Sequence, residues 1–441
     1  MDISVFVSRM ENNDDAGQQG LSDKGAAAYG LPYLGSSVVL SGLEGEHYDT
    51  LQDLLALKVG YDISNHLSLT SITSSWRTES DMWMDWDYSP NDWSHKDVDS
   101  ELDRISQELR LNYTNGRMKW LLGGYFDQDD AKTIRRKTSD GSVTNRSKGG
   151  DTYAVFGNMN YPLTEKLSMG LGARFEVSNR DFEDNITGDK REDNWEDFSP
   201  KASLEYAFTP DFMGYLTVAK GYRAGGFNET AEQAKYYSYD PETLWSYEVG
   251  AKTTFLDNRL VLNAAVFYMD IEDMQVSINT GKTNLMADVV NAAEATSKGV
   301  EIEAVYRPVR GLTLSAGFGY TDISFDEYTD NGVSFAGNQT TWSPEYTFNM
   351  GAQYRHPDGW YARCDLIGYG KTYFNRENTS SRDPYELVNL KLGYEWEHFD
   401  FYIYGNNIFD ENYDAERVWE GGYCTVFSEP GQLGAQLSYR F

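Results

Sequence analysis

Tryptophan and aspartate are interleaved in one stretch of the chain, "WRTESDMWMDWDYSPNDWSH", which begins at Trp76. Clustered exposed aromatic rings mark binding surfaces, so Trp83, Trp86, Tyr88 and Trp93 are predicted to stack on an incoming ligand. The alternative is that Trp76 belongs to an interfacial aromatic belt and that the other rings stabilise a long loop. The neighbouring aspartates have no calcium-loop spacing, so no metal site is predicted.

A second candidate is the segment "KGYRAGGFNE", residues 220–229. Arg223 is flanked by Tyr222 and Asn228, and a guanidinium group pairs well with an anionic ligand. These three residues are therefore predicted to bind a ligand where a strand enters a loop. The alternatives are an inward-facing arginine that contacts carboxylates elsewhere in the protein, or an ordinary glycine-rich strand end.

The sequence contains no motif that predicts an enzyme. The histidines have no zinc-ligand spacing, and the two cysteines, Cys364 and Cys424, are far apart. The segment "GYGKT" at 368–372 resembles part of a phosphate-binding loop, but Asp365 stands where that motif requires its first glycine. We therefore predict no enzyme and no cofactor. Whether the cysteines pair stays open.

Composition narrows the class of protein. The 441 residues carry a formal charge of −31, which argues against nucleic acid as a partner because phosphate binding needs a basic surface. Aromatic residues make up 15% of the chain, with 40 glycines and 11 prolines, a mixture that suits strands and turns. The sequence has no apolar run long enough for a membrane helix, and its beginning does not resemble a secretory signal.

Apolar and polar residues alternate strictly over many segments. In the last one, "GAQLSYRF", Leu433, Ala435, Leu437, Tyr439 and Phe441 share one face of an extended strand. The same period of two recurs in the segments 167–175, 300–304, 313–320 and 388–394. This pattern predicts half-buried β-strands throughout the chain.

The connections between these strands alternate in length. Short turns are predicted at 64–66, 114–117, 161–166, 209–211, 256–259, 307–311, 356–359 and 397–400, and long polar connections at 11–50, 78–98, 129–150, 179–194, 226–240, 323–340 and 410–429. Short turns on one side and long loops on the other are typical of an outer-membrane barrel. The fold class is thus all-β, a transmembrane antiparallel barrel of about 18 strands with both termini on the short-turn side. A soluble β-rich binding protein is the alternative, but strands longer than nine residues disfavour it.

Several segments together resemble the TonB-dependent receptors of Gram-negative outer membranes. They are "SQELRL" (106–111), "KGYRAGGFN" (220–228), residues 241–276, "SKGVEIE" (297–303), "NLKLGY" (389–394), "YGNNIFDENY" (404–413) and the terminal "GAQLSYRF". The resemblance covers the chain from about residue 100 to its end, and it is to the barrel of that family.

The resemblance implies active import of a scarce nutrient, most often a ferric siderophore, energised through TonB–ExbB–ExbD. Family members have a signal peptide, a TonB-binding segment and a plug inside a 22-stranded barrel. We do not find these N-terminal parts, so residues 1–441 are interpreted as an N-terminally truncated barrel domain. A plugless, porin-like passive channel remains the alternative. Contacts with outer-membrane lipid and lipopolysaccharide are also expected.

An aromatic C-terminal residue on an alternating strand resembles the signal read by the barrel assembly machinery, so Leu437, Tyr439 and Phe441 are assigned to it. In lipid an unpaired strand edge is costly. The final strand is therefore expected either to pair with the strand at residues 1–10 across a strained closure, or to face a gap.

Overall fold

The computed structural model describes residues 1–14, 19–21, 26–27, 47–85, 95–229, 234–278, 288–330, 332–418 and 424–440. Most of these residues form β-strands, and one short 3-10 turn, η2 (Ala234–Tyr236), interrupts them. None of the helical residues in these ranges belongs to a helix with the length and hydropathy needed to span a membrane.

The main sheet of the described residues contains nineteen strands, of which the two-residue β17 (Val333–Ser334) pairs only with β16. The other eighteen are antiparallel and pair in chain order. They are β1 (Asp2–Asp14), β3 (His47–Asp62), β4 (Leu67–Asp85), β5 (His95–Asn115), β6 (Met118–Lys137), β7 (Val143–Pro162), β8 (Leu167–Asp184), β9 (Asp189–Thr209), β10 (Phe212–Arg223), β13 (Glu242–Phe255), β14 (Leu260–Ile278), β15 (Asp288–Tyr306), β16 (Leu312–Asp330), β18 (Tyr346–Arg355), β19 (Trp360–Tyr369), β22 (Tyr385–Glu395), β23 (Phe399–Asn406) and β26 (Gln432–Tyr439). The predicted all-β antiparallel fold is confirmed.

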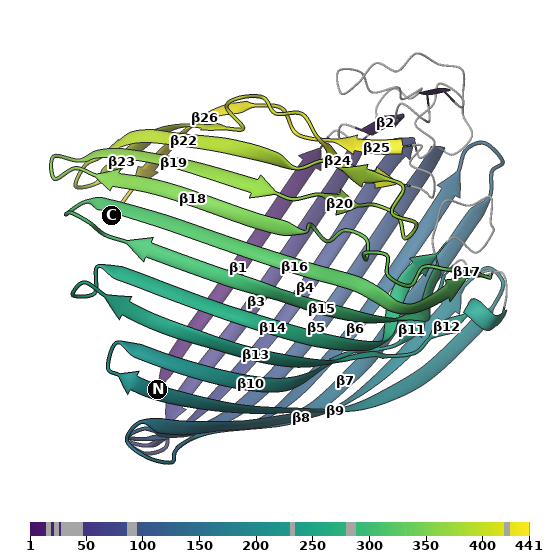
Figure 1. Cartoon of the computed structure of the whole chain (residues 1–441). Helices are drawn as coiled ribbons and strands as arrows, with labels where there is room; N and C mark the ends of the chain where they lie inside the picture. Colours follow the sequence, from purple (N-terminus) through teal and green to yellow (C-terminus); the bar gives the residue numbers. More distant parts are fainter. Residues whose placement is uncertain are drawn as a thin grey trace.

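The predicted short turns all connect consecutive strands of this sheet. For example, β3 ends at Asp62 and β4 begins at Leu67, while β18 ends at Arg355 and β19 begins at Trp360. These turns lie on one side of the molecule, and both chain ends lie on that same side (Figure 1). The predicted placement of the termini is therefore confirmed.

Three segments predicted as long loops, 78–98, 129–150 and 179–194, were wrong in extent, because strand continues through most of them. The connection between β6 and β7 covers only residues 138–142, and that between β8 and β9 covers only 185–188. The extensions of β6 and β7 are mostly polar on both faces, so hydropathy alternation could not reveal them. The β6–β7 ladder nevertheless continues without a register shift from the pair Arg136↔Val143 to the pair Lys119↔Asn160 at the short-turn end.

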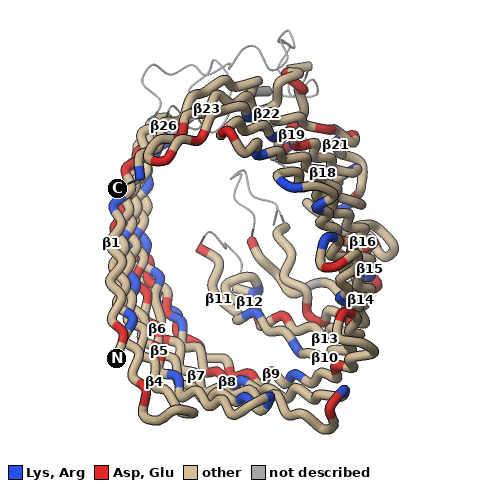
Figure 2. Tube along the Cα trace, turned by 90° about the vertical axis from the view of Figure 1, so that its left-hand side faces the viewer, with Lys and Arg blue, Asp and Glu red and all other residues tan. Residues whose placement is uncertain are grey.

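The sheet curls into a ring around a lumen (Figure 2). Large apolar side chains face outward in rows that follow the strand register. One such row contains Leu216, Val249, Val266, Val300 and Tyr320 on five neighbouring strands. Val249 and Val266 are 54% and 51% exposed, as expected for side chains that contact lipid rather than a protein core.

Aromatic rings lie over glycines that are their direct cross-strand neighbours. Phe156 of β7 pairs with Gly123 of β6, and Tyr215 of β10 pairs with Gly250 of β13. A Cβ atom added at Gly123 would lie 2.4 Å from the Phe156 ring, and one added at Gly250 would lie 2.4 Å from the Tyr215 ring. These glycines allow the rings to lie flat on the sheet.

The edges of the sheet are β1 and β26. Within the described ranges β1 pairs only with β3 and β26 only with β23, and no ladder joins the two edges. Of the two alternatives for the final strand, direct pairing with β1 is therefore not found. Leu437 and Tyr439 are 71% and 52% exposed, whereas Phe441 lies outside the described residues.

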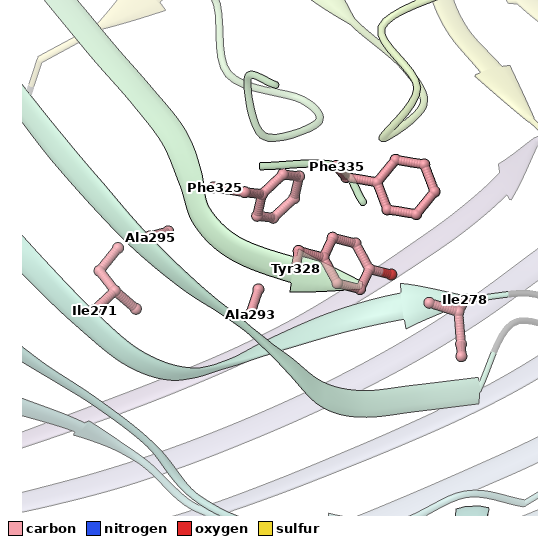
Figure 3. Packing of buried hydrophobic residues seen from close by; sticks show 7 residues of the cluster. All are labelled: Ile271, Ile278, Ala293, Ala295, Phe325, Tyr328 and Phe335. Atoms are coloured by element: carbon pink, nitrogen blue, oxygen red, sulfur yellow. The ribbon is translucent and has the colours of Figure 1, made fainter. Parts of the chain in front are cut away.

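Buried apolar packing is concentrated in the parts of β14, β15 and β16 that lie away from the short turns. The cluster contains Ile271, Ile278, Ala293, Ala295, Phe325, Tyr328 and Phe335 (Figure 3). Tyr328 contacts both Phe325 and Phe335, with ring centroids 5.0 and 5.1 Å apart. The β14–β15 ladder shifts register at Met274, whose side chain packs against this cluster. These strand ends therefore have a small core of their own.

Candidate ligand-binding site

The predicted site segment after β10 folds into the ring. There β11 (Gly226–Phe227) pairs with β12 (Ser238–Tyr239), and both lie inside the lumen (Figure 2). The β9–β10 ladder stops at Lys201↔Ala219, although β10 stays paired with β13 up to Arg223. The separation of β10 from β9 makes room for this inward segment, which comprises the described residues 224–229 and 234–239.

Aromatic and cationic contacts attach the inward segment to the wall. Trp195 of β9 is 9% exposed and contacts Phe227, with ring centroids 6.2 Å apart. The Arg191 guanidinium lies between the rings of Phe182 and Tyr237, at 4.7 and 3.9 Å from their centroids. Stacking of this kind holds an arginine in one orientation.

Asn228 fixes the middle of the segment. Its Nδ2 donates to the Tyr236 carbonyl at 2.8 Å and to the Val289 carbonyl at 2.7 Å, and its Oδ1 accepts from the Val289 amide at 2.8 Å. The residue is only 5% exposed. Its amide therefore joins the inward segment to the start of β15, and a role in ligand binding remains a prediction.

Glu229 makes a second attachment through charge. Its carboxylate pairs with Arg135 of β6 at 2.8 Å and with Lys148 of β7 at 2.6 Å. Burial by itself raises the pKa of Glu229, but the two cations outweigh it and lower the pKa to about 2. The carboxylate is thus charged at neutral pH, and it links the inward segment to the opposite hairpin.

Arg223 lies at the end of β10, where the inward segment begins. It is exposed, and no carboxylate among the described residues pairs with it. The cross-strand neighbour of Arg223 is Glu242, whose carboxylate instead accepts a hydrogen bond from the backbone amide of Gln275 at 2.7 Å. The adjacent Tyr222 hydroxyl is buried and has no hydrogen-bond partner in the described part of the chain. Because consecutive strand residues point to opposite faces, Arg223 offers an exposed unpaired cation on one face of this strand end, and the Tyr222 hydroxyl is enclosed on the other.

Two buried carboxylates of the barrel wall already have partners. Asp127, 2% exposed, pairs with Arg104, and Asp197, 7% exposed, pairs with Lys220 at 2.6 Å. A buried carboxylate is tolerated when a cation pairs with it, so these two groups are occupied and are not open to a ligand.

The predicted tryptophan surface is only partly described. Trp83 lies near the end of β4, and an even number of positions in an unbroken ladder separates it from the outward Leu69. Trp83 is therefore on the outer face, and Trp76 on the opposite one. Trp86, Tyr88 and Trp93 lie outside the described residues.

Three carboxylates, those of Asp81, Asp97 and Asp99, lie close together near Trp83. Arg136 donates hydrogen bonds to Asp97 at 3.2 Å and to Asp99 at 2.7 Å. We therefore assign no metal to this group.

A further cavity, of about 430 Å³, lies between the start of β22 and the connection after β23. Arg382 lies 4.8 Å from the Tyr385 ring centroid, and Tyr385 stacks on Tyr413 with centroids 3.8 Å apart. The Arg382 Nε is buried without a partner in the described residues. This arginine–tyrosine cavity was missed because its residues are separated in sequence and belong to no motif.

Glu229, Arg135 and Lys148 were also not identified from the sequence as one group. Each is an ordinary charged residue in a chain rich in them, and β6, β7 and the inward segment come together only in the fold. A local signal did exist for Glu229, since it ends the "KGYRAGGFNE" segment.

Comparison with known proteins gives a consistent result. The family model described as "TonB dependent receptor-like, beta-barrel" matches residues 6–408. The chain is 26% identical over 298 residues to the pesticin receptor of Yersinia pestis, covering 64% of this chain and 42% of the relative. It is 26% identical over 304 residues to the ferric-pyoverdine BN7/BN8 receptor of Pseudomonas putida, covering 66% and 34%. The matches thus span well under half the length of these relatives.

Solved structures share the fold. The ferric yersiniabactin uptake receptor FyuA of Yersinia pestis superposes with a TM-score of 0.76 at 19% identity, covering 90% of this chain and 63% of that one. The siderophore receptor PiuA of Acinetobacter baumannii gives a TM-score of 0.79 at 14% identity, covering 99% and 71%. The family consists of transport receptors of the outer membrane. Because the family model spans most of the chain, this protein belongs to the TonB-dependent receptors and carries their β-barrel.

Proposed function

We propose that this protein imports a ferric siderophore across the outer membrane, with energy supplied through TonB–ExbB–ExbD. The observation that carries the proposal is the family match over residues 6–408, together with relatives that are receptors for ferric pyoverdine and for pesticin. Lipid, lipopolysaccharide and the barrel assembly machinery are the further partners that an outer-membrane barrel requires.

We further propose that Arg223 and Tyr222 contact the ligand at the lumen side of the β10 end. The exposed, unpaired Arg223 guanidinium suits an anionic iron chelate, because it gains charge-assisted hydrogen bonds when the ligand binds. The Tyr222 hydroxyl is buried on the opposite face, so it would contact the ligand only after this end of β10 moves. Trp83, Trp86, Tyr88 and Trp93 remain candidates for an outer aromatic surface. Asn228 contributes indirectly, by holding the segment that follows Arg223.

The test is uptake of radioactive iron by a bacterial strain that lacks its own siderophore receptors and expresses the full-length gene. Cells are given a panel of ferric siderophores, in matched strains with and without TonB. We expect uptake of at least one chelate, lost without TonB. Uptake that persists without TonB and shows no saturation would favour the passive channel, and no uptake of any chelate would reject siderophore import.

A substitution tests the site. Arg223→Gln is expected to weaken ligand binding at least tenfold, because the variant keeps the size of the side chain but loses its charge. Arg77→Gln is the control, since Arg77 is an exposed arginine of β4 that pairs with Glu79 at 2.7 Å. Equal binding by the Arg223→Gln variant and wild type would remove Arg223 from the site.

A further inference from the structure

A second cluster of arginines lies at the opposite, short-turn end of the molecule. Arg259, Arg307, Arg310 and Arg355 line a cavity of about 490 Å³ together with Thr313 and Gln353. Arg259 ends the β13–β14 turn, Arg307 and Arg310 belong to the β15–β16 turn, and Arg355 ends β18. These three consecutive hairpin regions lie on the side of the chain termini (Figure 1). Their residues line this cavity, here called the basic pocket.

Backbone hydrogen bonds hold these turns in place. The Arg307 amide donates to the Arg259 carbonyl at 2.8 Å, and the Arg355 amide donates to the Gly311 carbonyl at 2.9 Å. Gly311 has a φ of 86°, and a Cβ there would lie 2.2 Å from the Arg355 carbonyl oxygen. Since only glycine fits this turn, the positions of the arginine backbones are fixed before any ligand binds.

The charges of the basic pocket are poorly balanced by the protein itself. Arg355 pairs with Glu395, with an Nε–Oε1 distance of 3.1 Å, and the Arg259 Nε donates to the Leu256 carbonyl at 3.0 Å. In the described ranges no carboxylate pairs with Arg259, Arg307 or Arg310, although the chain has 69 acidic and only 38 basic residues. Like charges held together repel each other, so an anion would stabilise this arrangement.

We propose that the basic pocket binds a ligand that carries at least two adjacent oxyanion groups, phosphates or carboxylates. Guanidinium groups bind such oxygens in bidentate pairs, and the cavity has the size of a small-molecule site. The site lies at the opposite end from Arg223 and goes beyond the import of a particular nutrient. Two sources offer this chemistry: a soluble polyanion that enters the short-turn mouth, or the headgroup of an anionic phospholipid in the surrounding membrane.

The test is a calorimetric titration with inorganic pyrophosphate of the full-length receptor in nanodiscs of phosphatidylcholine. We expect saturable binding that weakens as salt is added. The triple variant Arg259→Gln, Arg307→Gln, Arg310→Gln is expected to bind at least tenfold more weakly. Arg310→Gln alone, at an exposed turn position, is expected to bind at least threefold more weakly, which keeps the test informative if the triple variant does not fold.

A matched control removes three cations from another part of the same rim: Arg117→Gln, Lys119→Gln, Lys166→Gln. It changes the net charge equally, so less than a twofold effect on binding is expected. Repeating the titration in nanodiscs that contain cardiolipin, whose headgroup carries two phosphates, distinguishes the sources, because blocked binding identifies the lipid headgroup and unchanged binding a soluble anion. The proposal is overturned if wild type binds no pyrophosphate, or if both triple variants lose binding equally.

Discussion

Asn228 holds the inward segment with three hydrogen bonds from a side chain that is 5% exposed. Asn228→Ala leaves two carbonyls and one amide without partners, at a cost of about 2–4 kcal/mol. We expect hydrogen exchange in residues 226–229 to become at least tenfold faster. Asn194→Ala is the control, since Asn194 is exposed and its side chain has no described hydrogen bond. Similar exchange in both variants would contradict this role.

Glu229 makes the same attachment dependent on pH. Its pKa is about 2 in the folded protein and 4.5 for an ordinary glutamate, so the ion pairs stabilise the fold fully above pH 4.5. That stability is lost as the pH falls toward 2. We expect protection of residues 226–229 from hydrogen exchange to persist at pH 5 and to decrease below pH 4.

Glu229→Gln serves as the comparison in that experiment, because it removes the charge and keeps the shape. The variant is expected to show weaker protection at pH 7 and no further loss between pH 5 and pH 3. If Glu229→Gln and wild type show the same protection from hydrogen exchange at pH 5 and at pH 3, the ion pairs with Arg135 and Lys148 do not hold the segment.

At the scale of elements, two adjacent glycines of β6 provide a matched pair. A Cβ at Gly123 meets the Phe156 ring at 2.4 Å, whereas a Cβ at Gly124 has no atom within 4 Å. Gly123→Ala is therefore expected to lower the free energy of unfolding by about 1–3 kcal/mol through overpacking. Gly124→Ala is expected to leave it unchanged or slightly raised. Urea unfolding in vesicles measures both, and equal effects would refute the ring-over-glycine packing.

Strands and short turns were predictable because lipid on one side and water on the other impose a period of two on the sequence. The segment 313–320 in β16 and the turn 307–311 are examples, and both were found as predicted. The extended ends of β6 and β7 were not predictable, since both their faces are polar. Hydrogen bonding to neighbouring strands extends β6 and β7, and the hydropathy pattern carries no information about this pairing.

At the scale of the whole molecule, the outward row of apolar residues sets the membrane position. Val266→Arg is expected to destabilise the protein by about 2–4 kcal/mol, because the charge then faces hydrocarbon. Asn263→Arg on the same strand is expected to cost less, since Asn263 lies in register with Lys252 and Glu303. The measurement is the free energy of unfolding of both variants in vesicles. A larger loss for Asn263→Arg than for Val266→Arg would contradict the assignment of Val266 to the outward face.

The candidate site was only partly predictable for the same reason. Arg223 was identified from its local segment, and it does lie unpaired at a strand end. The pocket of Arg259, Arg307, Arg310 and Arg355 was not identified, because its members belong to three turns that meet only when the sheet curls. Short-range sequence patterns report local geometry, whereas such sites depend on which hairpins become neighbours.

The hairpins β6–β7 and β8–β9 end in connections of only a few residues, 138–142 and 185–188, at the side away from the chain termini. The strand ends beside these tips contact the inward segment: Arg135 and Lys148 pair with Glu229, and Arg191 lies 3.9 Å from the Tyr237 ring centroid. A peptide inserted at either tip, or an antibody bound there, is therefore expected to disturb the lumen as well as the outer surface.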